Sequence, residues 1–572
     1  MKIAIGFSWT AGIWVNTSGL LLGQLLSAKW YTVLGDKEYA SIIKWDNNNF
    51  FLYIADFTKD GTDAKPFIAR SIDHFFPFDD YAITKNTQLY VLKNIHPLKD
   101  VTVKYKNIFF FWAALKLLGI ACEEGEAMLA TQFSDDILAA NISCLSQWYT
   151  YFTKSIYNLS QNICPKKEFV FGNEMVGTWA IAAWMDFYSA YPMTPASSLI
   201  DVIVPFCHPE RSEGYEWSLD SSTGSEWHCV FSQWEDEIAV SMAMLGARFA
   251  GKRAMCGTSG GGFALMTESI SFSHIAELWW VYILSQRDGP STGTPTYTGQ
   301  SDLNYALNAS FGDTFPIVLA PSTFEEWYNL IWKALNRSDI YQHPVIFLID
   351  KQLSESYLSV DKTKLISEPI LRWKVEQLKD GKMEGEYKRY AIAADGISPV
   401  MLPWTENGEF IATSYEHDEY WATNEDPVVK KQQQDKRFKK LETFVQQEFT
   451  KDFYGYEIIN PEAKQFFVTF GVNRYVIEEY IRIKNSKLKD WKLKYWLIVI
   501  KVLQPLDMRL KEFLDIQVKQ IKKLIFVEMN TSGQLQELIT NTCWLNDKKW
   551  NNKITNIRKY TLYPIFAEDL VM

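Results

Sequence analysis

Residues 254–263 read AMCGTSGGGF, a short apolar run that ends in a threonine, a serine and three glycines. The apolar run predicts a buried strand, and the residues around Met266-Thr267-Glu268 predict the helix that follows it. Three further apolar runs, at 281–285, 317–320 and 345–350, alternate with helical segments. Strands that alternate with helices form parallel sheets covered on both faces, so this region is predicted to be an open, doubly wound α/β domain.

The α/β pattern extends in both directions, because a chain of 572 residues is too long for one hydrophobic core. An N-terminal strand, a Gly/Ser/Thr-rich loop and a leucine-rich helix begin a first α/β domain. We predict four segments: a first domain over 1–165, the doubly wound domain over 170–370, a connecting segment over 371–450, and a last α/β domain over 451–572. The fold class is therefore multidomain α/β.

Local patterns refine the two ends of this arrangement. The charged stretch 430–440 predicts a helix whose basic residues form an exposed, solvated face. Apolar runs at 466–470, 497–502 and 523–528 predict the strands of the last domain.

Residues 207–233 contain few apolar residues and no periodic pattern, which predicts an inserted surface loop. Cys207 and Cys229 stand beside His208 and His228 in this loop, but their spacing is irregular, and we favour a plain loop over a metal site. The seven cysteines of the chain show no C-x-x-C spacing. The sequence therefore predicts neither a zinc site nor iron–sulfur ligands in this chain.

The bulk charge limits the class of partner. A formal net charge of −10 with 22% charged residues argues against nucleic acid or an anionic membrane as the main partner. The longest apolar runs, such as 107–120, are too short to span a bilayer. The first residues read as a strand rather than a signal segment, and the cysteines are dispersed, so we expect a cytoplasmic protein.

Two segments of the doubly wound domain present polar side chains in defined positions. A helix predicted over 177–188 leads into Tyr191-Pro192-Met193-Thr194-Pro195, where the two prolines preset the backbone that aims the hydroxyl of Thr194. Glu235-Asp236-Glu237 then opens a helix. Acidic residues are also common at helix N-termini for electrostatic reasons alone, so Glu237 is a candidate that the pattern does not decide.

Two further segments follow predicted strands. Thr258, Ser259 and Gly260 begin the glycine run, whose backbone N–H groups can approach an anion or a cofactor ring closely. Arg287 begins a loop rich in hydroxyl side chains that includes Thr296. Loops after the strands of α/β sheets commonly carry ligand-binding groups, and a guanidinium there can clamp a carboxylate.

Taken in order, these segments resemble the alpha subunit of the 2-oxoacid:ferredoxin oxidoreductases. The motifs that carry the resemblance are Gly172-Asn173-Glu174, the 191–195 turn, Glu235-Asp236-Glu237-Ile238-Ala239, 258–268, 287–296, Asp395-Gly396-Ile397-Ser398-Pro399, Glu416-His417-Asp418-Glu419 and 528–535. The first 160 residues resemble the family's gamma unit, including Glu38-Tyr39-Ala40-Ser41, where the family usually has proline in place of Ala40. The resemblance implies a gamma-type domain, a thiamine-diphosphate pyrimidine-binding domain and a transketolase C-terminal-like domain.

The resemblance also implies an activity and roles for the candidate residues. The family decarboxylates a 2-oxoacid oxidatively, forms acyl-coenzyme A and CO2, and passes the electrons to ferredoxin; the fused layout favours 2-oxoglutarate. Thr194, Arg287 and Thr296 would bind the 2-oxoacid, and Glu237, Thr194 and Arg287 would be the catalytic residues. Glu237 would hydrogen-bond the aminopyrimidine of thiamine diphosphate, and the loop that begins at Thr258 would line the cofactor.

Other parts of the expected active site are missing from this sequence. It contains no Gly-Asp-Gly followed by asparagine at magnesium-diphosphate spacing, and no cluster cysteines. The resemblance therefore implies a beta-type partner subunit that holds the diphosphate, Mg²⁺ and a [4Fe-4S] cluster. No metal site is assigned to this chain.

Three alternatives remain open. A catalytically silent assembly subunit would keep the fold without turnover, and a pyruvate-specific homologue would keep the chemistry with another substrate. An NAD oxidoreductase would use residues 9–19 as a dinucleotide loop, but they lack a G-x-G-x-x-G pattern and an acidic ribose partner.

The tryptophan content is unusual, because 22 Trp stand beside 29 Gly in a chain where Trp should be rare. Several stand where the family pattern has a small residue, and an indole cannot replace glycine where φ is positive or two backbones touch. We hypothesise that a codon rendered here as tryptophan is read as glycine in the source organism; the alternative is a genuinely tryptophan-rich protein. The positions are Trp9, Trp14, Trp45, Trp179, Trp184, Trp279, Trp280, Trp404, Trp421, Trp491 and Trp496.

Overall fold

The computed structural model describes residues 2–7, 13–28, 32–36, 49–54, 88–92, 108, 111–112, 115–116, 118–149, 167–207, 229–374, 378–379, 382–383, 386–459, 464–486, 495–550, 552–567 and 569–570. The predicted features that lie outside these residues are the 38–41 motif, His208, His228, Trp9, Trp45 and Trp491. The chain forms two compact units, one of residues 1–172, 355–365 and 566–572, the other of 173–354 and 366–565. Across the described ranges, no helix combines the length and apolar composition needed to cross a membrane.

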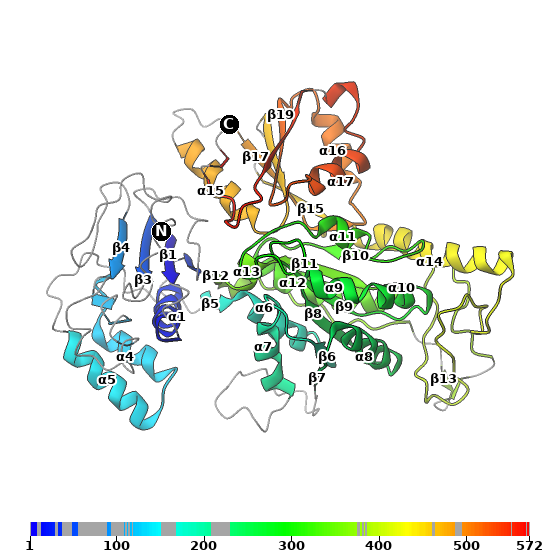
Figure 1. Ribbon diagram of the computed structural model, residues 1–572, viewed down its shortest axis with the longest axis horizontal. Coiled ribbons are helices and arrows are strands. Elements are labelled where there is room, and N and C mark those ends of the chain that lie inside the picture. Colours follow the sequence, from blue (N-terminus) through cyan, green and yellow to red (C-terminus); the bar gives the residue numbers. More distant parts are fainter. Residues whose placement is uncertain are drawn as a thin grey trace. The chain divides into compact units, whose positions relative to one another are not determined.

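The first unit contains a six-stranded sheet in the order β4-β3-β1-β2-β12-β5 (Figure 1). Its elements are β1 (Lys2–Phe7), α1 (Ile13–Ala28), β2 (Thr32–Asp36), β3 (Asn49–Ile54), β4 (Gln88–Leu92), α4 (Cys122–Ala130), α5 (Asp135–Tyr149), β5 (Lys167–Phe171), β12 (Tyr357–Asp361) and the 3-10 turn η7 (Lys362–Lys364). Strands β1 to β4 pair in parallel, whereas β12 is antiparallel to both β2 and β5. The strand at 357–361 therefore returns to the first sheet from far along the chain.

The second unit contains a seven-stranded sheet in the order β18-β10-β11-β9-β8-β6-β7. Its elements are α6 (Gly172–Ala182), β6 (Phe187–Ala190), α7 (Ser198–Cys207), β7 (Val230–Gln233), α8 (Glu237–Phe249), β8 (Ala254–Thr258), α9 (Gly260–Leu265), α10 (Thr267–Ile275), β9 (Val281–Gln286), α11 (Leu303–Leu307), β10 (Ile317–Leu319), α12 (Phe324–Tyr341), β11 (Val345–Asp350) and α13 (Lys351–Ser354). All pairings are parallel except that of β18. The predicted α/β class and the four strands predicted in this region are confirmed.

Alternate residues of the central strands face opposite sides of this sheet. Cys256, Tyr282 and Leu348 lie in one core cluster with Val240 of α8. The next residue, Ile283, is equally buried but is not part of that cluster, and α12 packs on its strand and on β11. Helices therefore cover both faces, which explains why these strands read as continuous apolar runs.

The same core cluster continues into a five-stranded sheet in the order β15-β17-β16-β19-β20. Its elements are β15 (Tyr456–Ile459), β16 (Gln465–Thr469), α15 (Asn473–Ser486), β17 (Tyr495–Ile500), α16 (Arg509–Gln517), β19 (Lys523–Glu528), α17 (Gln534–Thr542), η8 (Lys548–Trp550) and β20 (Ile554–Arg558). The strand predicted at 497–502 is confirmed over 497–500, which belong to β17, but it is wrong at its end. Lys501 lies between the two strands and pairs with Glu326 and Glu457 at 2.8 Å, and β18 (Val502–Gln504) joins the seven-stranded sheet instead.

The helix predicted at 177–188 is also wrong at its C-terminal end. Helix α6 stops at Ala182, and β6 already begins at Phe187. The insertion predicted at 207–233 is shorter than expected, because Cys207 ends α7 and Val230–Gln233 form the edge strand β7. Cys207 and Cys229 are joined in a disulfide with their Cα atoms 4.6 Å apart.

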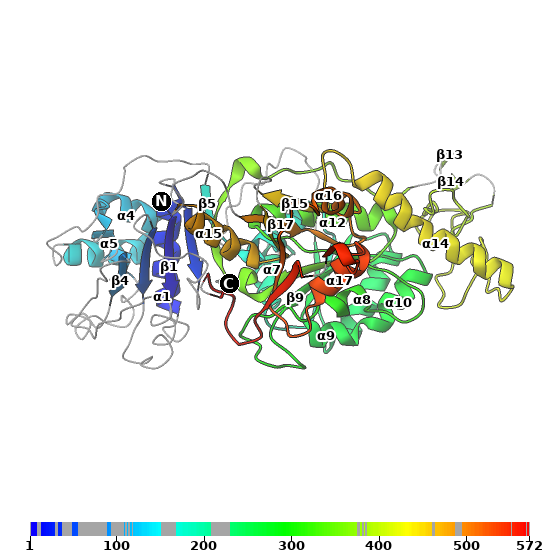
Figure 2. The same cartoon turned by 90° about the horizontal axis from the view of Figure 1, so that it is seen from above.

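Helix α14 (Pro427–Glu448) connects the two sheets of the second unit and is one continuous helix (Figure 2). A short hairpin of β13 (Leu378–Lys379) and β14 (Lys382–Met383) precedes it. The basic stretch was predicted to be exposed, but Lys436 and Lys440 are buried and both pair with the buried carboxylate of Glu277. Burial lowers the pKa of each lysine to about 8, although Glu277 attracts the charged form. The helix is thus anchored by its own basic residues.

Candidate active site

Four candidate residues are brought together by the order of the strands. Strands β9, β8, β6 and β7 are neighbours in the parallel sheet. Arg287 follows β9, Thr258 ends β8, Thr194 follows β6, and Glu237 follows β7. The carboxyl ends of parallel strands meet at one edge, which is where open α/β sheets bind ligands.

Glu237 is the first residue of α8, and its side chain is only 3% exposed. The preceding Asp236 is a helix cap, because its Oδ1 accepts the backbone N–H of Ala239 at 2.8 Å. Glu237 Oε1 is buried and has no hydrogen-bond partner. Burial raises the pKa of Glu237; the charge of Asp236 adds to the rise, and that of Arg287 opposes it. A buried carboxyl oxygen without a partner is costly unless a ligand completes its hydrogen bonding.

The glycine run forms the first turn of α9 and packs against Glu237. A Cβ on Gly262 would lie 2.8 Å from Glu237 Cδ and would also overlap Thr258 Oγ1. Thr258 is fully buried, with its Oγ1 3.8 Å from Met193 Sδ. Gly262 is therefore required to be small, whereas a Cβ on Gly261 would meet nothing within 4 Å.

Arg287 is 7% exposed and reaches the proline turn at residues 191–195, where its Nη1 donates to the carbonyl oxygen of Thr194 at 2.7 Å. Its Nε is buried without a partner. The peptide bond between Thr194 and Pro195 is cis. Asn173, fully buried, donates its Nδ2 to Pro195 O at 2.8 Å and to Ser198 Oγ at 2.7 Å. The side chains of Arg287 and Asn173 thus hold the proline turn that positions the Thr194 hydroxyl.

Asp302 is a fifth residue of this group, and it was not predicted from the sequence. A Cβ on Gly260 would lie 2.8 Å from Asp302 Oδ2, so the carboxylate faces the start of α9. Burial raises the pKa of Asp302 to about 6, against the opposing charge of Arg287. Arg287 is therefore flanked by two carboxyl groups, those of Asp302 and Glu237.

The remaining predicted residues differ in how they are placed. Ser259 is buried beside Thr258, and its Oγ has no partner. Gly260 begins α9 and faces Asp302. Thr296 is half-buried on the loop after Arg287, and within the described residues no hydrogen bond joins its side chain to Thr194 or Arg287. The part of Thr296 in the site therefore stays a prediction.

The end of the Arg287 loop is fixed by Gln300. Gln300 Nε2 donates to Asp350 Oδ1 at 2.9 Å, and its Oε1 accepts from Asn473 Nδ2 at 2.7 Å. Asn530 Nδ2 donates to the Gln300 backbone oxygen at 3.0 Å, and the Gln300 N–H donates to Met529 O at 2.9 Å. Residues 528–535, expected as a family signature, therefore pin this loop to the C-terminal sheet.

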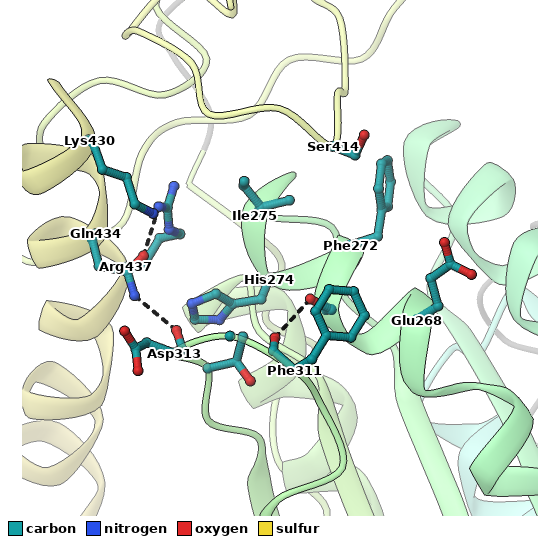
Figure 3. Close-up of a pocket in the computed structure, with 13 residues that line it drawn as sticks. Glu268, Phe272, His274, Ile275, Phe311, Asp313, Ser414, Lys430, Gln434 and Arg437 are labelled. Carbon is teal, nitrogen blue, oxygen red and sulfur yellow. Dashed lines mark hydrogen bonds between the residues drawn. The ribbon is translucent and has the colours of Figure 1, made fainter. Parts of the chain in front are cut away.

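A pocket of about 430 Å³ lies between α10 and α14 (Figure 3). Its lining includes His274, Phe311, Lys430 and Arg437. Lys430 and Arg437 both pair with the single carboxylate of Glu416 at 2.8 Å, so both cations already have an ion-pair partner. None of the four residues at the strand ends lines this pocket. In the part of the chain that the structure covers, no group of three or more His, Cys, Asp or Glu side chains is placed to hold a metal ion.

Comparison with known proteins shows which family of enzymes the chain is similar to. Residues 179–436 match the family model described as pyruvate flavodoxin/ferredoxin oxidoreductase, thiamine diphosphate-binding. The chain is 31% identical over 439 residues to 2-oxoacid:ferredoxin oxidoreductase 2, subunit alpha, of Aeropyrum pernix, which covers 74% of this chain and 65% of that protein. It is 27% identical to 2-oxoacid:ferredoxin oxidoreductase subunit alpha of Saccharolobus solfataricus, over 97% of this chain and 96% of that one.

Two further similarities extend the comparison. The chain is 28% identical over 378 residues to 2-oxoglutarate synthase subunit KorA of Methanocaldococcus jannaschii, covering 66% of this chain and 92% of that one. Its fold matches a solved structure of 2-oxoglutarate:ferredoxin oxidoreductase from Magnetococcus marinus with 2-oxoglutarate, coenzyme A and succinyl-CoA bound, with a TM-score of 0.76 and 24% identity over 97% of this chain and 95% of that one. Full-length alpha subunits of 2-oxoacid:ferredoxin oxidoreductases therefore align with nearly the whole of this chain, and the family model matches its residues 179–436.

Proposed function

We propose that this alpha subunit works with a beta-type partner and oxidises 2-oxoglutarate, forming succinyl-coenzyme A and CO2 and passing two electrons to ferredoxin. The names of the KorA relative and of the Magnetococcus marinus protein favour 2-oxoglutarate. The partner subunit would hold the diphosphate with Mg²⁺ and a [4Fe-4S] cluster, since this sequence lacks the corresponding motifs.

The observation that carries the proposal is the buried carboxyl of Glu237, whose Oε1 has no partner. Together with the unpartnered Oγ of Ser259 and the small Gly262, it fits a polar, nitrogen-containing ring better than an apolar filling. We propose that Glu237 holds the aminopyrimidine of thiamine diphosphate and that Thr258, Ser259 and Gly260 line it. The bound cofactor would supply the carbanion chemistry that breaks the bond between the carboxylate and the carbonyl carbon.

The protein's own residues would bind the substrate and control the proton. Burial raises the pKa of Glu237 and so favours the protonated form, which can donate a hydrogen bond to a ring nitrogen. Arg287 is held by the Thr194 carbonyl oxygen through Nη1, so its remaining N–H groups are available for a carboxylate. The Thr194 hydroxyl, and Thr296 from the same loop as Arg287, would complete the site for the 2-oxoacid.

A coupled assay tests this proposal. The chain is co-expressed anaerobically with its beta-type partner, and coenzyme A-dependent reduction of a viologen dye is measured with 2-oxoglutarate, pyruvate and branched 2-oxoacids. We expect the highest kcat/KM with 2-oxoglutarate, and loss of turnover in Glu237→Gln and Arg287→Ala but not in the surface variant Glu442→Gln.

Two results would contradict the proposal in different ways. A higher kcat/KM for pyruvate than for 2-oxoglutarate would show that the proposed substrate is wrong, but it would leave the proposed reaction type unchanged. No turnover from an assembled, cofactor-loaded complex would identify a silent assembly subunit.

A further inference from the structure

Three tryptophans have a backbone conformation that favours glycine. The φ angle is +59° at Trp184, +91° at Trp421 and +56° at Trp544. In the described ranges, nine non-glycine residues have a positive φ, and chance placement would put fewer than one of the chain's 22 tryptophans among them. A bulky side chain makes a backbone conformation with positive φ unfavourable, so tryptophan is unexpected at each of these positions.

Trp184 and Trp544 occupy the same position in the same helix-ending motif. At the end of α6, the Trp184 N–H donates to Ile181 O at 2.9 Å and the Met185 N–H donates to Ala180 O at 3.0 Å. The equivalent two bonds end α17 around Trp544, at 3.4 and 2.8 Å. This pair of bonds defines the Schellman motif, in which the left-handed residue is usually glycine.

The chain itself uses glycine at this position in other helices. The Gly251 N–H donates to Arg248 O and the Lys252 N–H donates to Ala247 O, both at 2.9 Å, with φ of +77° at Gly251. Gly119 has the same role, with φ of +70°. Among the described helix ends, this motif therefore has glycine at positions 119 and 251 and tryptophan at positions 184 and 544.

Two non-glycine residues with positive φ at helix ends, Glu277 and Gln342, have a visible reason for being there. Glu277 binds two buried lysines, and Gln342 donates its Nε2 to the buried Ser398 carbonyl oxygen. By contrast, the side chains of Trp184 and Trp544 are 51% and 70% exposed. The ammonium of Lys511 lies 5.2 Å from the centroid of the Trp544 ring, and both indoles are largely exposed, so neither side chain is held by burial as Glu277 and Gln342 are.

Trp421 stands in a different turn with the same requirement. His417 and Thr423 pair as an antiparallel bridge, and the Trp421 N–H donates to Asp418 O at 3.4 Å. Hairpin loops of this kind place a left-handed residue, usually glycine, just before the second strand. A φ of +91° lies beyond the left-handed helical region that other residues occasionally adopt.

We infer that the natural protein has glycine at positions 184, 421 and 544, because one codon is rendered as tryptophan in the printed sequence and decoded as glycine in the cell that makes the protein. The inference does not extend to every tryptophan. Trp327 is fully buried in α12 and belongs where it stands. The inference is independent of the proposed function, because it rests on backbone geometry alone.

Peptide mass spectrometry of the protein isolated from its source cells tests the inference directly. We expect the peptides that contain positions 184, 421 and 544 to have the mass for glycine, and the peptide that contains position 327 to have the mass for tryptophan. Tryptophan at any of the first three positions would overturn the inference.

A second measurement uses the full recombinant chain and separates backbone strain from loss of the indole. Trp184→Gly and Trp544→Gly should each raise Tm by about 1–2 °C relative to the printed sequence, because a left-handed residue with a Cβ is unfavourable. Trp184→Ala and Trp544→Ala, which keep the Cβ, should be less stable than the glycine variants, and Trp327→Gly should lower Tm. Equal stability of the alanine and glycine variants at both helix ends would contradict the inference.

Discussion

Substitution of Gly262 tests whether the position of Glu237 determines turnover. In Gly262→Ala the new Cβ would lie 2.8 Å from Glu237 Cδ, whereas ordinary van der Waals contact begins at 3.4 Å, and it would also overlap Glu237 Oε1 and Thr258 Oγ1. The carboxyl group must therefore move by at least 0.6 Å, the difference between these two distances.

The size of the effect follows from this displacement. A misplacement of about 1 Å in a reacting group can lower the rate by about 100-fold, so we expect Gly262→Ala to lower kcat by about 10- to 100-fold. Added volume in a packed site costs about 1–3 kcal/mol of stability, which a chain of this size tolerates. The variant should therefore fold and assemble but turn over slowly.

Gly261→Ala is the matched control, because it adds the same methyl group to the same turn and meets nothing within 4 Å. Both variants are assembled with the partner subunit, and dye reduction and thiamine diphosphate affinity are measured side by side. Gly261→Ala should keep wild-type kcat. Equal kcat in the two variants would refute the reasoning that the Glu237 carboxyl must occupy its observed position.

Three further outcomes follow from buried charges. Glu237→Gln, which keeps the shape but removes the titratable group, should lower kcat by about 100-fold or more, measured by dye reduction, while the assembled complex keeps its Tm. Glu277→Gln leaves two buried lysines without a counter-charge and should cost about 3–5 kcal/mol in urea unfolding, with the exposed Glu442→Gln as a control that changes little. Burial raises the pKa of Asp302 from 3.8 to about 6. At a pH between these two values, Asp302 is protonated in the folded chain but ionised in the unfolded chain. Stability should fall by up to about 3 kcal/mol as the pH rises from about 4 to 6. Asp302→Asn should flatten this slope, and an unchanged slope would show that Asp302 is not the group responsible.

The features that could be predicted from the sequence are those that depend on a local pattern of residues. The buried parallel strands were visible as apolar runs, and the candidate residues were visible because each follows a strand or begins a helix. Thr194, Glu237, Thr258 and Arg287 could therefore be named before their strands were known to be neighbours. Their chemical roles remain proposals.

The errors arise where distant residues decide the structure. Lys436 and Lys440 looked solvated because nothing near them in sequence indicates Glu277, which lies more than 150 residues earlier. Asp302 was missed because a single aspartate in a loop has no periodic signal. Lys501, where the predicted strand breaks, pairs with Glu326 of helix α12, which lies far from it in sequence.

The edge strand β18 and the side chain of Gln300 also limit how this protein can be divided. The C-terminal sheet region contributes β18 to the seven-stranded sheet and supplies groups that hydrogen-bond Gln300 at the end of the Arg287 loop. A fragment that ended before residue 451 would expose an unpaired sheet edge and leave buried amide groups without partners. The two sheets of the second unit therefore do not behave as interchangeable modules, and recombination between relatives should succeed only when both are inherited together.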